Sequence, residues 1–61
     1  MNKFVLNPKE AATYLGVGEN KIRKLCENRE IKAMRSGRNW KIPIPMLERY
    51  AMEKAEKGEQ I

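Results

Sequence analysis

Four side chains that can donate hydrogen bonds are clustered on one short segment of the chain. Within residues 19–27, apolar residues recur at Ile22, Leu25 and Cys26, a spacing that places them on one face of an α-helix. The positions opposite and beside this face are polar. Lys and Arg can donate to guanine O6 and N7 in the DNA major groove, and Asn can pair with adenine. The candidate donors are Asn20, Lys21, Arg23 and Lys24.

A tight turn and an earlier helix must position this segment. Gly16 and Gly18 are separated by one residue, and glycine is favoured at the end of one helix and accepted at the N-cap of the next. Upstream, Asn7-Pro8 is typical of an N-cap followed by proline in the first turn. We therefore expect a helix over residues 8–15 that ends at Gly16. A helix, a short glycine-containing turn and a second helix form a helix-turn-helix, whose second helix enters the major groove.

After residue 30 the pattern changes from helical to alternating. Residues 31–35 and 38–42 each alternate partly about the turn dipeptide Ser36-Gly37, which predicts a β-hairpin, or wing. The apolar run 4–6 predicts a brief strand at the start of the chain. Proline interrupts the second hairpin strand at position 43, and Pro45 is suited to the first turn of a third helix that ends at Gly58.

These elements together predict a small α+β fold. The order is a short N-terminal strand, a helix-turn-helix, a two-stranded wing and a C-terminal helix, which is the order of a winged helix-turn-helix. We expect residues 1–61 to form one such domain, because a chain of 61 residues is too short for a second core. Residues 59–61, beyond the last helix, are expected to fray.

Further candidate contacts lie outside the second helix. Arg35, Arg38 and Asn39 lie at or near the tip of the wing, and a narrow minor groove attracts arginine. The alternative is a solvated hairpin end. Asn7 and Lys9 begin the first helix, where an N-terminus can hold a phosphate. A plain N-cap is an equally good interpretation of these two residues.

The aromatic residues and the cysteine are expected in the core. Trp40, Tyr14 and Tyr50 fall on the apolar faces of their predicted elements, so packing is favoured over stacking on single-stranded bases. Cys26 shares the inward face of the second helix and is expected to be a small core residue rather than a reactive thiol. Lys21 lies at the flank of the polar face, so we expect it to contact phosphate only.

Composition supports a polyanionic partner. The formal net charge is +5, and residues 1–45 hold ten Lys or Arg and four Glu, whereas residues 46–61 hold three and four. Such a basic body suits a partner with phosphates, although a solvated, solubility-promoting surface is the alternative. The sequence has one cysteine and no histidine, which argues against disulfides, zinc sites and histidine-based catalysis. We expect no catalytic residues, no metal, no cofactor and a cytoplasmic, nucleoid-associated protein.

Three stretches carry a resemblance to a known family. They are Glu10-Ala11-Ala12-Thr13-Tyr14-Leu15-Gly16-Val17-Gly18, Glu19-Asn20-Lys21-Ile22-Arg23-Lys24-Leu25 and Gly37-Arg38-Asn39-Trp40-Lys41-Ile42. In their order and spacing, residues 5–52 resemble the excisionases, small winged-helix proteins related to the DNA-binding part of MerR-type regulators. The similarity is greatest to excisionases of conjugative transposons. It implies a second helix in the major groove, a wing along the minor groove or backbone, and several copies that bend DNA beside a tyrosine integrase.

Three functions are compatible with the sequence. The first is an architectural factor that binds a specific duplex site, bends it and assists a tyrosine integrase in excision. The second is a small transcriptional regulator of a phage or mobile element that uses the same DNA surface. The third is a winged-helix adaptor that binds protein only, and the cationic face of the second helix argues against it. No nucleophile and base pair can be assembled from these residues, so an enzyme is the least favoured class.

Overall fold

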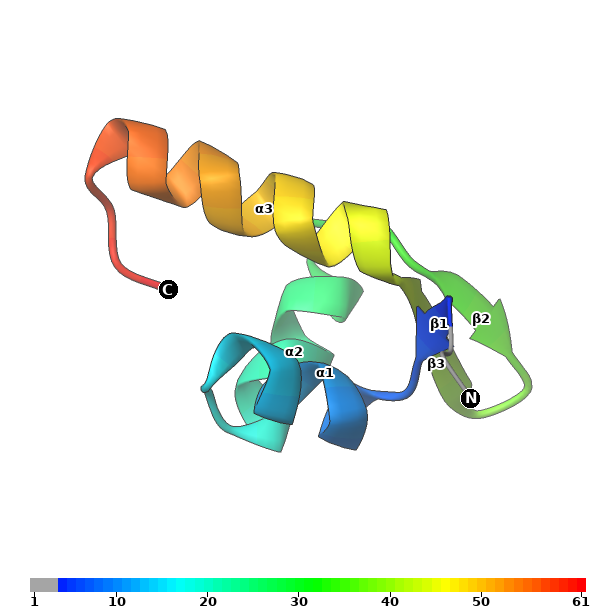
Figure 1. The fold of residues 1–61 in the computed structure, drawn as a ribbon. Helices are drawn as coiled ribbons and strands as arrows, with labels where there is room; N and C mark the ends of the chain where they lie inside the picture. The colour runs from blue at the N-terminus through cyan, green and yellow to red at the C-terminus, as the bar shows by residue number, and fades with distance from the viewer. Residues whose placement is uncertain (1–3) are drawn as a thin grey trace.

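The computed structural model describes residues 4–61, and in them three helices accompany a small antiparallel sheet. In Figure 1, α3 lies across α1 and α2, and the sheet stands at the end where α3 begins. This is the winged helix-turn-helix α+β fold that the sequence predicts. The elements are β1 (Val5–Leu6), α1 (Pro8–Leu15), α2 (Glu19–Glu27), β2 (Met34–Ser36), β3 (Asn39–Pro43) and α3 (Ile44–Lys57).

The first helix has the limits that its sequence predicts. The Asn7 side chain accepts from the backbone N–H of Glu10 at 2.8 Å, and the Glu10 carboxylate accepts from the backbone N–H of Asn7 at 3.0 Å. This reciprocal capping box satisfies two donors at the start of α1. Gly16 ends the helix with φ of 74°, a left-handed conformation that other residues adopt at a cost. The left-handed backbone of Gly16 therefore determines where the turn between α1 and α2 begins.

Loss of this capping box gives the first testable prediction. We expect Asn7→Ala to reduce the free energy of unfolding by about 1 kcal/mol, because the backbone N–H of Glu10 loses the Asn7 side-chain oxygen as its acceptor. For a domain of this size that corresponds to a melting temperature about 4–8 °C lower. Thermal unfolding followed by circular dichroism measures it. Asn20→Ala is the matched control, since Asn20 is exposed; equal melting temperatures for the two variants would contradict the assigned cap.

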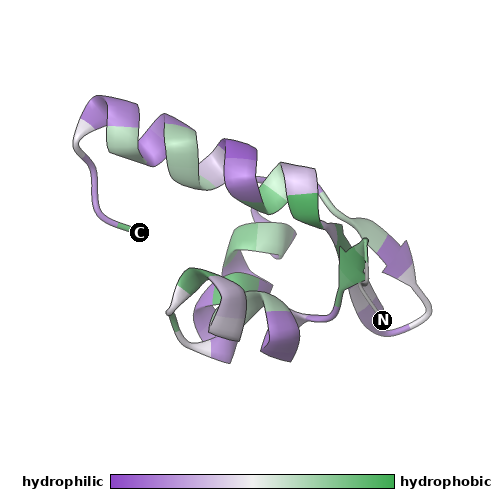
Figure 2. Cartoon of the chain, viewed as in Figure 1, coloured by the Kyte–Doolittle hydropathy of each residue, from purple (hydrophilic) through white to green (hydrophobic). Residues whose placement is uncertain are grey.

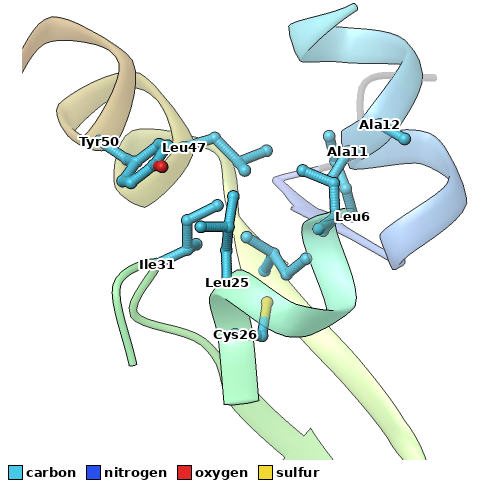
Figure 3. Packing of buried hydrophobic residues seen from close by; sticks show 10 residues of the cluster. Leu6, Ala11, Ala12, Leu25, Cys26, Ile31, Leu47 and Tyr50 are labelled. Atoms are coloured by element: carbon cyan, nitrogen blue, oxygen red, sulfur yellow. The ribbon is translucent and has the colours of Figure 1, made fainter. Parts of the chain in front are cut away.

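The second helix is held by its narrow apolar face. Gly18 is the N-cap of α2, and Ile22, Leu25 and Cys26 are buried against the rest of the core. Figure 3 shows Leu25 and Cys26 directed from α2 into the cluster that also receives Leu47 of α3. Three buried positions in nine leave most of this helix available to solvent. The prediction of a short amphipathic helix after Gly18 is confirmed.

The first strand of the wing begins later than predicted. The sequence predicts a strand from Ile31, whereas β2 begins at Met34. After α2 the chain turns sharply, and the N–H groups of Glu30 and Ile31 both donate to the Leu25 carbonyl, at 2.9 and 3.2 Å. Ile31 is 1% exposed. Ile31 is therefore a buried loop residue that covers the end of α2. In the sequence it gives the same pattern as a strand residue that faces inward.

The sheet connects the wing to the body of the protein. β3 is the central strand; it pairs antiparallel with β2 on one side and with β1 on the other. Pro43 is the last residue of β3 and pairs with Val5, and the next residue, Ile44, already begins α3. The Ile44 N–H donates to the Phe4 carbonyl at 2.9 Å. The third helix thus starts one residue before Pro45, directly from the sheet.

A core of mostly small and branched side chains joins these elements except β2, whose three residues are all exposed. Figure 3 shows the buried residues of α1, α2, α3 and the loop after α2 converging, and Figure 2 shows hydrophobic and hydrophilic bands alternating along α3. Among described residues, no polar side chain is buried. The residues of the core cluster are Leu6, Ala11, Ala12, Ile22, Leu25, Cys26, Ile31, Ile42, Leu47 and Tyr50.

The expectation that the aromatic residues pack in the core is confirmed for Tyr50 and in part for Trp40. Tyr50 is buried, whereas Trp40 is half-buried at the edge of the core. The expectation for Tyr14 is wrong. It is 49% exposed, and its hydroxyl donates to the Glu48 carboxylate of α3 at 2.9 Å. Ala12 takes the buried place instead, because α1 turns its two alanines toward the core.

The segment after α3 does not fray as expected. Gly58 ends α3 with φ of 67°, and the chain then folds back. Ile61 packs partly against the core cluster, and the Glu59 carboxylate accepts from Lys54 Nζ at 3.1 Å. Lys54 Nζ also lies 4.0 Å from Glu30 Oε1, and it is positioned over the Tyr50 ring. One lysine therefore ties this segment to the loop after α2.

Candidate nucleic-acid interface

Three of the four donors predicted on α2 face solvent. Asn20, Lys21 and Lys24 are exposed, and none of them makes a side-chain ion pair or hydrogen bond within residues 4–61. The buried face of α2 lies on the other side. The structure thus leaves open to a partner the face that the sequence predicts for major-groove contact.

Arg23 differs from its neighbours because it is already paired. Its Nη2 and Nε donate to Glu19 Oε2 at 2.7 and 3.2 Å, and the two side chains are 42% and 40% exposed. An exposed i,i+4 pair contributes little stability. It does fix the direction of the guanidinium, whose Nη1 has no hydrogen-bond partner within residues 4–61. Glu19 was not among the sequence candidates, although its spacing of four from Arg23 could have indicated it.

The wing brings its polar residues to an exposed hairpin. Gly37, with φ of 63°, and Arg38 form the turn between β2 and β3. Asn39 pairs with Ser36 at the first position of the ladder, so Arg38 and Asn39 lie at the tip as predicted. Arg35 lies one step further back and pairs with Trp40. Its guanidinium carbon is 4.8 Å from the centre of the Trp40 ring, a cation–π geometry that fixes the side chain.

The start of α1 is less available to an anion than the sequence suggests. Asn7 and Lys9 are both exposed. The Asn7 side-chain Oδ1 is engaged in the capping box, and the Glu10 carboxylate occupies the same end of the helix. A carboxylate there already complements the helix dipole. Asn7 serves as the cap, and Lys9 forms no ion pair within the described part of the chain, so Lys9 is the positive group left for a phosphate.

Comparison with known families identifies the architecture. The family model described as a helix-turn-helix domain matches residues 5–55. The chain belongs to this helix-turn-helix family. Searches of characterised proteins and of solved structures found no significant match. Membership supports DNA binding, and it supports double-stranded DNA as the partner.

The shifted pKa values of Tyr14 and Cys26 in this helix-turn-helix domain have structural causes. The hydrogen bond to Glu48 raises the pKa of Tyr14, with smaller contributions from desolvation and from the charge of Glu48. Burial raises the pKa of the Cys26 thiol, and the neighbouring Glu27 adds to the effect. Cys26 is 2% exposed. A buried thiol held protonated is a packing residue, in agreement with the sequence prediction.

Residues 4–61 contain no group of three or more Cys, Asp or Glu side chains placed to hold a metal ion. No helix of this part of the chain is long and apolar enough to cross a membrane.

Proposed function

We propose that this helix-turn-helix protein is an excisionase, a recombination directionality factor that binds a specific duplex site and bends it. The observation that carries the proposal is the exposed, cationic face of α2 beside an exposed wing. In this proposal Lys24, Asn20 and Arg23 read base edges in the major groove, and Lys21 contacts phosphate. Arg38 and Asn39 of the wing contact the adjacent minor groove, with Arg35 close behind them. At the start of α1, Lys9 reaches the DNA backbone, while Asn7 serves as the helix cap.

The role in excision is supported by the sequence resemblance described above. Excisionases act in several copies on neighbouring sites beside a tyrosine integrase, so both the integrase and further copies of this chain are proposed partners. A bend imposed on the DNA would bring distant integrase sites together. The second candidate is a transcriptional regulator of a mobile element, which would use the same face of α2 and the same wing.

The experiment that tests DNA binding is a salt titration of affinity for duplex DNA. Each neutralised phosphate contributes a slope of about −0.9 to the plot of log K against log salt. With about five phosphate contacts from α2, the wing and α1, we expect a slope of about −4 or steeper. A flat plot would contradict the cationic surface as the binding face.

The excision role is separated from regulation by two further measurements. Selection from a random duplex library gives the preferred site, and circular-permutation mobility shifts on that site test bending. We expect mobility to vary with the position of the site in the fragment. A footprint at the end of a mobile element beside integrase sites supports the excisionase, whereas a footprint over a promoter without bending supports the regulator.

A further inference from the structure

A groove of about 600 Å³ lies between the two elements assigned to DNA contact. It is formed by the C-terminal end of α2, the segment joining α2 to β2 (green in Figure 1) and the paired strands of the wing. Of its lining residues, the proposed function uses Arg35 alone. Its lining residues are Cys26, Glu27, Arg29, Ile31, Lys32, Ala33, Arg35 and Trp40.

The groove is cationic. Arg29, Lys32 and Arg35 line it against a single carboxylate, Glu27. None of the three cations forms an ion pair within residues 4–61. Arg35 is held over the Trp40 ring, which leaves the donors at the edge of its guanidinium free. The groove therefore presents unpaired positive groups around an aromatic side chain, an environment suited to a phosphodiester.

Arg29 occupies a backbone position where arginine is unfavourable. Its φ is 62°, and it is the one residue other than glycine with positive φ in residues 4–61. The other two helices end at Gly16 and Gly58, both left-handed, which is the usual choice. At the end of α2 the chain carries arginine instead, at a cost in backbone strain. Compared with glycine, arginine at this position adds a positive charge to the lining of the groove.

The geometry of DNA indicates what passes over the groove. Adjacent major and minor grooves are separated by one sugar–phosphate strand. With α2 in the major groove and the wing in the minor groove, that strand must cross the surface between them. Glu27 follows Lys24 and Asn20 at helical spacing and lines the groove, so the groove begins where the polar face of α2 ends.

We propose that this groove seats the sugar–phosphate strand between the two DNA grooves, with Arg29 and Lys32 as its phosphate contacts. The inference rests on the proposed function, because it takes α2 and the wing as the DNA-contacting elements. It adds two residues to the interface and assigns the strained end of α2 to DNA binding. Arg35 joins them from the wing, positioned by Trp40.

The test uses Arg29→Gly and Lys32→Ala, singly and together, in the full chain. Glycine at position 29 keeps the left-handed backbone and removes the charge. The matched control is Lys57→Ala, which removes one exposed positive charge at the far end of α3. The probe is a short duplex of random sequence, titrated at several salt concentrations, and each variant is also melted without DNA.

We expect each single variant to make the salt slope shallower by about 0.9, and the double variant by about twice that. Lys57→Ala is expected to leave the slope unchanged. Arg29→Gly has a second expected result: its melting temperature equals or exceeds that of the wild type while its affinity falls. A purely structural Arg29 would instead lower the melting temperature when replaced and leave the salt slope alone.

The outcomes separate the two proposals. If the wild type binds with a steep salt slope and the groove variants have the same salt slope and affinity as Lys57→Ala, the groove proposal alone is overturned. If the wild type does not bind duplex DNA, the proposed function falls and the groove proposal falls with it.

Discussion

Lys24→Ala is expected to weaken binding to the selected duplex site about tenfold, equivalent to about 1.4 kcal/mol, and to leave the melting temperature nearly unchanged. Lys24 lies at the middle of the exposed face of α2 and makes no ion pair within the described part of the chain. Its loss therefore removes a contact to DNA without removing one within the protein. Gel-shift or fluorescence anisotropy titration measures the affinity, and circular dichroism measures the melting temperature.

A charge-matched control separates a local contact from a general loss of positive charge. Arg49→Ala removes one exposed charge from α3 and is expected to change affinity by less than about twofold. Arg23→Ala is expected to weaken binding as Lys24→Ala does, because it also leaves Glu19 unpaired beside the phosphates. Wild-type affinity for both α2 variants would remove this helix from the reading role.

Leu47→Ala is expected to have the largest effect on stability. Leu47 is fully buried and packs α3 against the core that the other elements share. A buried Leu→Ala change costs about 2–5 kcal/mol, whereas the core of a domain this small rarely supplies more than about 3–5 kcal/mol. A large fraction of the variant should therefore be unfolded at room temperature. Urea titration followed by circular dichroism measures the change in the free energy of unfolding.

The same helix supplies the control for this experiment. Met52 lies on α3 and is 61% exposed, so Met52→Ala should change the free energy of unfolding by less than about 0.5 kcal/mol. Both substitutions place alanine in a helix, which keeps the difference in helix propensity small. Equal stability of the two variants would mean that α3 is not anchored through Leu47.

The helices were predictable from sequence because their local chemistry is explicit. Asn7-Pro8 marks the start of α1 and Gly16 its end, and Gly18 marks the start of α2. The exposed donors of α2 followed from the same reasoning, since Ile22 and Leu25 determine which face is buried. The order of elements then indicated the wing, which the pairing of β2 with β3 confirms.

The departures from prediction arise where contacts are distant in sequence. Ile31 has the burial of an inward strand residue, yet it belongs to a loop held by the Leu25 carbonyl. Tyr14 has the spacing of a core residue but lies at the edge where α1 meets Glu48 of α3. Ile61 follows a helix-ending glycine and still packs on the core. Periodicity reports which face of one element is apolar, and it carries no information on which neighbour covers that face.

The candidate site could be predicted only in part from the sequence, for the same reason. The spacing of Asn20 and Lys24 shows that they share a face, whereas the groove between α2 and the wing depends on how two elements meet. Arg29 in particular gives no sequence signal, because its left-handed backbone becomes visible only in three dimensions.

The proposed function requires that the exposed face of α2 lies in the major groove of a double strand. The most direct measurement is intermolecular NOE spectroscopy on the isotopically labelled protein bound to its selected duplex. We predict contacts from the side chains of Asn20 and Lys24 to cytosine H5 and thymine methyl protons, which line the major groove. Intermolecular contacts confined to α3, with none from α2, would contradict the account.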